Sequence, residues 1–165
     1  MINVAIIDDE QLAVDNLKYI LSRFPDLNIV GAYTDIDDFM DCLAKNHVQL
    51  VFMDIEMPET NGLELASLVT EKYKNIEIVF ATAYNQYAVE AFEVSAIDYI
   101  LKPLSISRIT KTIEKIRQRI PKEEEKEKNV FIKCFGGFEI YINNNLIPFK
   151  LSKAKEVLAY LINSM

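Results

Sequence analysis

The sequence has few of the residues that build disulfide frameworks or zinc sites. Its 165 residues include two cysteines and a single histidine. Cys42 and Cys134 stand far apart and in no CxxC pattern, so we interpret both as ordinary reduced thiols rather than as a disulfide or a metal site. His47 has no second histidine or cysteine near it in the sequence, and we interpret it as a loop residue rather than a ligand.

The chain also lacks long apolar runs and an excess of basic residues. No segment approaches the roughly 20 apolar residues that cross a bilayer, and the amino terminus has no basic stretch followed by an apolar one, so we expect a cytoplasmic protein without membrane contact. Asp and Glu outnumber Lys and Arg by 25 to 18, for a net charge of -7. This charge argues against a broadly nucleic-acid-binding surface, so any DNA contact would come from a local basic face.

What the sequence does have is an alternation of short apolar runs with amphipathic segments. Strands are predicted at 3–7, 27–32, 49–53, 77–81 and 97–101, and helices at 10–24, 35–45, 63–73, 86–94 and 105–120. Thr34 or Asp35 would cap the second helix, and Pro25 would stop the first, whose apolar positions include Leu12 and Leu17. Because crossovers between parallel strands are right-handed, the alternation predicts an α/β fold: a doubly wound five-stranded parallel sheet of flavodoxin-like order 2-1-3-4-5.

Polar residues stand just past four of these five apolar runs. Asp8 and Asp9 follow the first run, Asp54 the third, Thr82 the fourth and Lys102 the fifth. The carboxyl ends of parallel strands share one edge of the sheet, so we expect these side chains to meet there. Three neighbouring carboxylates are stable only with a cation, and hard oxygen ligands favour Mg²⁺ or Mn²⁺. Such a site suits a phosphoryl group, with Asp54 as the nucleophile that accepts it as an acyl phosphate.

Four sequence motifs, taken in order, resemble the receiver domain of two-component response regulators. They are IIDDE at 6–10, VFMDIEMP at 51–58 followed by Asn61-Gly62, ATA at 81–83 and DYILKP at 98–103. The resemblance covers residues 1–120 and implies a flavodoxin-like receiver. Asn61-Gly62 is by itself a turn and helix-start signal. Lys102-Pro103 by itself suggests an ordinary strand end with a turn. With Asp54 already placed at this edge, we favour the other interpretation, a cis peptide bond that directs the ammonium into the site, as in the family.

The resemblance implies a role for each residue of this edge. Asp54 would be the phosphoacceptor and a metal ligand, with Asp9 as a direct ligand, Asp8 as a ligand mainly through water, and the backbone carbonyl of Glu56 as a further ligand. Thr82, Ala83 and Lys102 would bind the phosphoryl group, and Tyr99 would be the aromatic switch. The chain would then be a stoichiometric phosphoacceptor rather than an enzyme. It would be phosphorylated by a sensor histidine kinase and would control transcription through the surface of its fourth helix, fifth strand and fifth helix.

That surface has two interpretations. Residues 84–94 mix aromatic and acidic side chains, and the following helix carries the basic residues Arg108, Lys111, Lys115, Arg117 and Arg119. Opposite charges could pair across a twofold axis in a phosphorylation-dependent homodimer, since an isologous interface repeats each contact. Alternatively, these residues form an ordinary solvated helix face.

Two other classes of protein use the same edge of such a sheet. A phosphohydrolase of the haloacid dehalogenase type also has an aspartyl nucleophile and Mg²⁺, but it places a second Asp two residues past the nucleophile, where Glu56 follows Asp54. A flavin carrier needs a phosphate-cradling loop after the first strand, where Asp8 and Asp9 would repel the flavin phosphate. We keep the hydrolase as the alternative function, because it would turn over many substrates where a receiver takes one phosphoryl group.

After Ile120 the composition changes abruptly. Residues 121–129 contain no apolar residue besides Pro121 and are predicted to be a charged linker. In the tail, 130–165, strands are predicted at 130–134, 138–142 and 146–149, with a turn at 143–145, followed by a helix capped by Ser152. The tail resembles the opening of a winged-helix DNA-binding domain of bacterial transcriptional activators, without its recognition helix. It is either an incomplete part of a longer regulator or the β/α tail of a short one.

Overall fold

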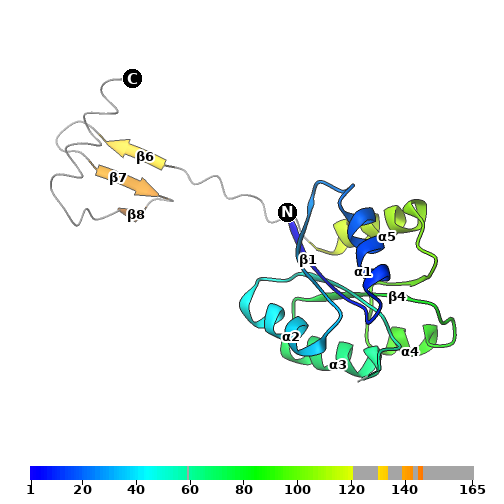
Figure 1. Cartoon of the computed structure of the whole chain (residues 1–165). Coiled ribbons are helices and arrows are strands. Elements are labelled where there is room, and N and C mark those ends of the chain that lie inside the picture. The colour runs from blue at the N-terminus through cyan, green and yellow to red at the C-terminus, as the bar shows by residue number, and fades with distance from the viewer. Residues whose placement is uncertain (59, 121–129, 134–138, 143–144, 147–165) are drawn as a thin grey trace. The chain divides into compact units, whose positions relative to one another are not determined.

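The computed structural model describes residues 1–58, 60–120, 130–133, 139–142 and 145–146 (Figure 1). The chain divides into two units, residues 1–122 and 123–165. Within the described residues, no helix has both the length and the apolar character that a membrane span requires. The candidate site lies in the first unit.

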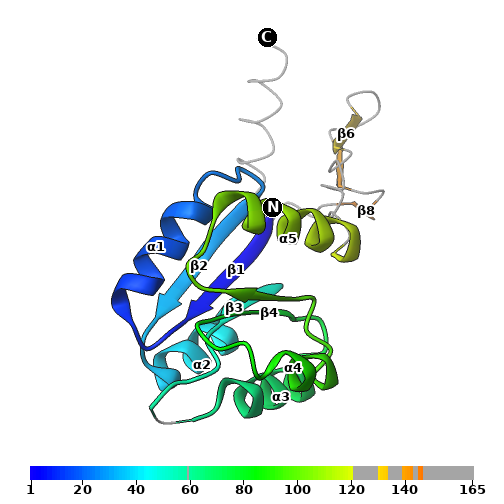
Figure 2. The same ribbon diagram turned by 90° about the vertical axis from the view of Figure 1, so that its right-hand side faces the viewer.

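Five parallel strands form the sheet of the first unit. They are β1 (Ile2–Ile7), β2 (Leu27–Tyr33), β3 (Leu50–Met53), β4 (Glu77–Thr82) and β5 (Asp98–Leu101), and their order in the sheet is β2-β1-β3-β4-β5 (Figure 2). Every residue of β3 is buried, as a central strand covered on both faces requires. The predicted doubly wound fold and strand order are confirmed.

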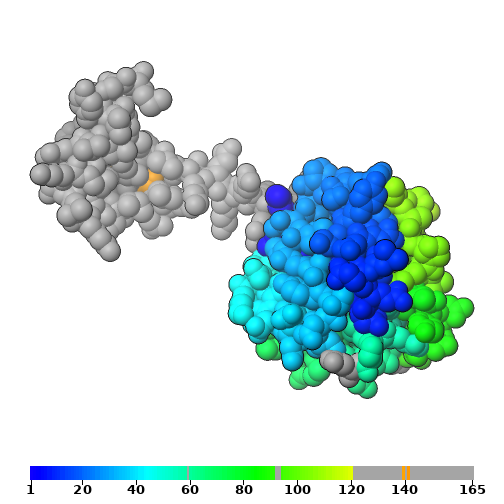
Figure 3. Space-filling model, viewed as in Figure 1, coloured from blue at the N-terminus to red at the C-terminus, as the bar shows by residue number. Residues whose placement is uncertain are grey.

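Helices cover both faces of this sheet (Figures 1 and 2). One core layer packs α1 (Gln11–Leu21) and α5 (Ile106–Arg119) against the sheet. The other packs α2 (Ile36–Lys45), α3 (Gly62–Lys72) and α4 (Ala88–Glu93) against the opposite face. In the space-filling view, the blue side chains around α1 form much of the visible face (Figure 3). The two apolar layers hold the strands in place and leave the strand ends free for polar residues.

The structure corrects two details of the first helix. The helix ends at Leu21, three residues before the predicted end, because the amides of Arg23 and Phe24 bond to the carbonyls of Ile20 and Leu21 in tighter turns. Leu12 was expected on the apolar face but is 82% exposed. At 3.6 residues per turn it lies on a different side of the helix from Leu17 and Leu21, which are buried.

The other predicted elements are found with small shifts at their ends. Asp35 caps α2 by accepting a hydrogen bond from the amide of Asp38, as predicted. Helix α4 is shorter than the predicted 86–94 and begins at Ala88. Elements at these positions are specified by apolar periodicity, while their ends depend on local capping and turn contacts.

The second unit contains a small antiparallel sheet. Its strands are β6 (Val130–Lys133), β7 (Glu139–Ile142) and β8 (Asn145–Leu146), in the order β6-β7-β8. Strand β8 begins at Asn145, inside the turn predicted at 143–145, because Asn145 pairs with Ile142. The linker at 121–129, the end of the third predicted strand and the helix capped by Ser152 lie outside the described residues.

Candidate functional site

Three carboxylates meet at the carboxyl edge of the sheet. Asp8 follows β1 and Asp54 follows β3, and the parallel register that pairs Ile7 with Met53 places them side by side. The amide of Asp54 donates to the carbonyl of Ile7 at 3.0 Å, which extends this register by one residue. Asp8 and Asp54 are buried and Asp9 is exposed, and one ligand oxygen of each lies within 4.8 Å of those of the other two.

Lys102 is the cation of this edge. It follows β5, its amide donates to the Thr82 carbonyl at 2.8 Å, and its peptide bond to Pro103 is cis, as predicted. The ammonium nitrogen lies 2.8 Å from Oδ2 of Asp8 and 2.8 Å from Oδ2 of Asp54. Burial opposes the charge of the lysine, but its hydrogen bonds to Asp54 and Asp8 outweigh burial and raise the pKa of Lys102.

The charge balance of the cluster suits a divalent cation. Burial raises the pKa of the Asp8 carboxyl, and the neighbouring Lys102 only partly offsets this effect. Three carboxylates and one ammonium leave two negative charges, which a single Mg²⁺ would neutralise. All the available donors are hard oxygen atoms, the type that Mg²⁺ prefers, and Asp9 stands on the open side of the cluster. The residues therefore fit the metal that the sequence predicts.

The loop after Asp54 is held against the site by a glycine. Gly62 is the first residue of α3, and its amide donates to the carbonyl of Ile55 at 2.7 Å. A Cβ atom added to Gly62 would lie 2.0 Å from the backbone oxygen of Asp54. Asn61 caps the helix by accepting from the amide of Leu63 at 2.8 Å. The predicted helix start at Asn61-Gly62 is confirmed, but its contact with the backbone of Asp54 could not be foreseen from the sequence.

The predicted switch residues lie on β4 and β5 beside the cluster. Thr82 is fully buried, and its hydroxyl accepts from the amide of Tyr84 at 3.4 Å. The hydroxyl of Tyr99 donates to the backbone carbonyl of Tyr84, so β5 is tied to the loop that follows β4. The rings of Tyr99 and Phe80 lie 6.5 Å apart. No hydrogen bond between Thr82 and the three carboxylates is found among the described residues, and the switch roles stay predictions.

A cavity of about 500 Å³ opens above the carboxylates. Its lining includes Asp9, Asp54, Glu56, Ala83, Tyr84 and Lys102. The Glu56 carboxylate accepts from the hydroxyl of Tyr87 at 3.0 Å, and a hydrogen bond with Glu56 raises the pKa of the Tyr84 hydroxyl. The role of the Glu56 carbonyl as a metal ligand stays a prediction. The site thus combines a cation-binding cluster, one fixed ammonium and open space for a small anionic group.

The open parallel sheet with an acidic cluster and a lysine at its carboxyl edge defines an α/β domain that can bind a cation and a small anionic group. The family model of the response regulator receiver domain matches residues 4–114 of the sequence. The chain belongs to this family. This is a family of signalling proteins, not of classical enzymes. The match therefore favours the receiver over the hydrolase alternative.

Named relatives agree with this assignment. The chain is 41% identical over 130 residues to the sensory transduction protein LytT of Bacillus anthracis, which covers 79% of this chain and 53% of the relative. It is 36% identical over 148 residues to the transcriptional regulatory protein BtsR of Escherichia coli. That match covers 86% of this chain and 62% of BtsR. The crystal structure of the response regulatory domain of mrkE from Klebsiella pneumoniae has 37% identity and a TM-score of 0.66, covering 72% of this chain and 97% of that domain. The chain spans about half the length of LytT.

Proposed function

We propose that the chain is the phosphoacceptor of a two-component phosphorelay, in which a sensor histidine kinase transfers one phosphoryl group to Asp54. The observation that supports this proposal is the joint geometry of the acidic cluster. Ligand oxygens of Asp8, Asp9 and Asp54 lie within 4.8 Å of one another, and the Lys102 ammonium is 2.8 Å from two of the carboxylates. Asp8, Asp9 and Asp54 would hold Mg²⁺ or Mn²⁺, with the Glu56 carbonyl as a further ligand.

In phosphoryl transfer, Asp54 is the nucleophile, and its neighbours position its carboxylate. One oxygen of Asp54 forms a bond to phosphorus while the bond from phosphorus to the kinase histidine nitrogen breaks, and that nitrogen keeps the electron pair. Both oxygens of the Asp54 carboxylate have partners before transfer: Oδ1 accepts from the amide of Ile55 at 2.6 Å, and Oδ2 accepts from the Lys102 ammonium at 2.8 Å. When bound, Mg²⁺ offsets the charge that the carboxylates and the phosphoryl oxygens bring together.

The other side chains respond to the new phosphoryl group. Lys102 moves its ammonium from the carboxylates to a phosphoryl oxygen. The Thr82 hydroxyl turns away from the Tyr84 amide to donate to another oxygen, and the Ala83 amide donates to the third. Because Tyr99 bonds to the carbonyl of Tyr84, movement of this loop reaches β5 directly. A bias of a few kcal/mol between two packings of this kind is enough to invert their populations.

Intact-mass spectrometry with acetyl phosphate and Mg²⁺ tests the phosphoacceptor. We expect one added phosphoryl group on the wild-type chain and none on Asp54→Asn. Asp41→Asn, which changes an exposed carboxylate on α2, is the matched control and should be phosphorylated like the wild type. A wild-type chain that gains no mass but steadily releases inorganic phosphate would instead support the hydrolase.

A second copy of the chain is the proposed partner of the phosphorylated form. The face of α4, β5 and α5 exposes apolar side chains, with Val89 72% and Leu101 47% exposed. Within the described residues, the basic side chains Arg108, Lys115, Arg117 and Arg119 pair with carboxylates of the same unit. Apolar contacts would therefore drive association, where the sequence left open charge pairing across a twofold axis or an ordinary solvated face. In sedimentation velocity the phosphorylated chain should form dimers and phosphorylated Val89→Asp should not; unchanged sedimentation of the phosphorylated wild type at high concentration contradicts the proposal.

The part of the protein that would act on DNA is proposed to lie beyond the linker. We propose a receiver domain at 1–120, a charged linker at 121–129 and, at 130–165, the amino-terminal part of a winged-helix domain that contacts DNA. The antiparallel sheet β6-β7-β8 supports this proposal, because a small sheet of this kind precedes the first helix of such domains. A crystal structure of the natural gene product tests it: a recognition helix packed on this sheet is expected, and any other fold there rejects the winged helix.

A further inference from the structure

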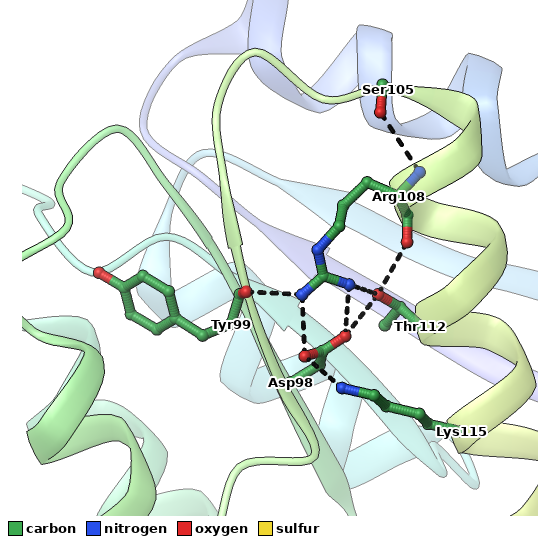
Figure 4. A network of polar contacts seen from close by, with 6 residues as sticks. All are labelled: Asp98, Tyr99, Ser105, Arg108, Thr112 and Lys115. Carbon is green, nitrogen blue, oxygen red and sulfur yellow. Dashed lines mark hydrogen bonds and ion pairs between the residues drawn. The ribbon is translucent and has the colours of Figure 1, made fainter.

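A cluster of polar side chains joins the beginning of β5 to the first turns of α5 (Figure 4). Arg108 donates from Nη1 to Oδ2 of Asp98 at 2.7 Å and from Nη2 to Oδ1 at 2.9 Å. The same Nη2 donates to the backbone carbonyl of Tyr99 at 2.8 Å. Thr112 and Lys115 also donate to the Asp98 carboxylate, at 2.7 and 2.9 Å. One guanidinium therefore holds the side chain of one β5 residue and the backbone of the next.

The contact with Tyr99 gives a hydrogen-bond donor to a backbone carbonyl on an edge strand. Strand β5 pairs only with β4, so its other side has no neighbouring strand in this sheet. Exposed backbone groups on such an edge need other partners. Arg108 supplies one for the Tyr99 carbonyl from α5, and Asp98 in turn orients Arg108 through two parallel hydrogen bonds.

We call the contacts of Arg108 with Asp98 and the Tyr99 carbonyl the Arg108 clamp. The clamp joins the two ends of the segment that carries Lys102. Residues 100–107 run from the end of β5 into α5, and Arg108 contacts residues on the other side of this segment, at Asp98 and Tyr99. The Lys102 side chain is only 17% exposed and must bring one nitrogen within 2.8 Å of two separate carboxylates. A lysine side chain has many rotamers, so such a placement depends on a backbone that is held in position.

We propose that Arg108 is a positioning residue of the site: by clamping Asp98 and the Tyr99 carbonyl, it fixes the segment that places the Lys102 ammonium against Asp8 and Asp54. Arg108 acts through Lys102 and does not itself touch the carboxylate cluster. Its effect on phosphoryl transfer rests on the proposed function, whereas its effect on the placement of Lys102 does not. A displacement of about 1 Å in a positioned group is enough to slow a reaction by up to roughly a hundredfold.

Arg117 provides a matched control on the same helix. It donates to Asp26 through Nε at 2.7 Å and through Nη2 at 2.6 Å, so it also forms a bidentate ion pair from α5. Asp26 lies between α1 and β2 rather than on β5. Replacing each arginine with glutamine therefore separates the general anchoring of α5 from the clamp on the Lys102 segment.

The first measurement is the rate of amine acetylation at Lys102, followed by peptide mass spectrometry without metal or phosphate. We expect Arg108→Gln to raise this rate, because a Lys102 amine that is no longer held 2.8 Å from the Asp8 and Asp54 carboxylates, with its side chain only 17% exposed, becomes more accessible to the reagent. Arg117→Gln should leave the rate within about twofold of the wild type, and Lys45 on α2 provides the internal reference. In the second measurement, phosphorylation by acetyl phosphate should be about tenfold slower in Arg108→Gln and unchanged in Arg117→Gln.

Each result decides the inference. Equal acetylation of Lys102 in the wild type and both variants overturns it, and so does an equal rise in both variants, since anchoring of α5 would then be sufficient. If the wild-type chain gains no phosphoryl group, the proposed function fails while the acetylation rates still judge the clamp. Should Arg108→Gln not fold, Asp98→Asn weakens the same clamp, and an unchanged acetylation rate in that variant rejects the proposal.

Discussion

Lys102 balances the charges of the carboxylate edge. Its ammonium contacts Asp8 and Asp54 at 2.8 Å each, and both carboxylates are buried. Without a cation, two buried carboxylates would face each other across a short distance and destabilise the folded state. A lysine at this position can stabilise the metal-free domain and still move to a phosphoryl group, because its charge lies at the end of a long side chain.

Removal of the Lys102 ammonium should therefore destabilise the metal-free protein. We expect Lys102→Ala to lower the free energy of unfolding by about 2 kcal/mol in urea titrations with EDTA, because it leaves buried carboxylates without their partner. Added Mg²⁺ should recover part of this loss, since a ligand at a hundred times its Kd stabilises by about 2.7 kcal/mol. The control Lys45→Ala removes an exposed pair with Asp41 and should change stability by less than about 0.5 kcal/mol. Equal losses in the two variants would contradict this account.

Among the helices, α3 begins in direct contact with the site. The helix begins at Gly62, directly against the backbone of Asp54, and Asn61 caps it. A helix that starts so close to a strand end needs a residue without a side chain at the contact. The position of α3 and the backbone of Asp54 are thus determined together.

Gly62 and Gly31 differ in what an added side chain would meet. A Cβ at Gly62 would lie 2.0 Å from the Asp54 backbone oxygen, whereas a Cβ at Gly31 would lie 2.3 Å from the ring of Tyr33. The backbone of Asp54 cannot yield without moving the site, but a tyrosine ring can rotate. We expect Gly62→Ala to lower the free energy of unfolding by about 3 kcal/mol and Gly31→Ala by about 1 kcal/mol. Thermal unfolding would show the difference, and similar melting temperatures would argue against it.

Across the whole receiver unit, ion pairs hold α5 against the sheet and its loops. Arg108 and Lys115 pair with Asp98, Arg117 with Asp26, and Arg119 with Glu77. Beneath them, Ile109, Ile113 and Ile116 are fully buried in the core layer that α5 shares with α1. The apolar face brings the helix to the sheet, and the pairs set its position along the strands.

The stability of the receiver unit should depend on acid through Asp98. Burial by itself raises the pKa of this carboxyl, but hydrogen bonds from Arg108, Lys115 and Thr112 outweigh burial and lower the pKa well below its usual range. A carboxyl whose pKa is lower in the folded state than in the unfolded state stabilises the fold. This stabilisation is fully present when the pH is above the ordinary carboxyl pKa of 3.8, and it is lost as the pH falls below that value.

Chemical unfolding at a series of pH values tests this dependence. Asp98→Asn should be about 2 kcal/mol less stable than the wild type at neutral pH, and the difference should shrink below the ordinary carboxyl pKa of 3.8. Asp41→Asn, in an exposed pair, should show little difference at any pH. A gap between wild type and Asp98→Asn that is constant down to strongly acidic pH would rule out the ionised Asp98 as its source.

Much of the fold and of the carboxylate edge could be predicted from local patterns. Apolar runs of strand length alternate with helical periodicity, and that alternation specifies a parallel sheet with helices on both faces. A residue just past a parallel strand must stand at the shared edge, so the sequence alone places Asp8, Asp54 and Lys102 together. These features depend on short stretches of chain and on rules of handedness that do not vary with side-chain detail.

Other features were decided only when the chain packed in three dimensions. The contact of Gly62 with the Asp54 backbone and the pairing of Arg108 with Asp98 both depend on the angle and distance between elements. The basic residues of α5 looked free for a partner in the sequence, yet Arg117 pairs with a residue 91 positions earlier in the chain. Helical periodicity tells which residues share a face, but which carboxylate each cation meets is set by how that face is laid against the sheet.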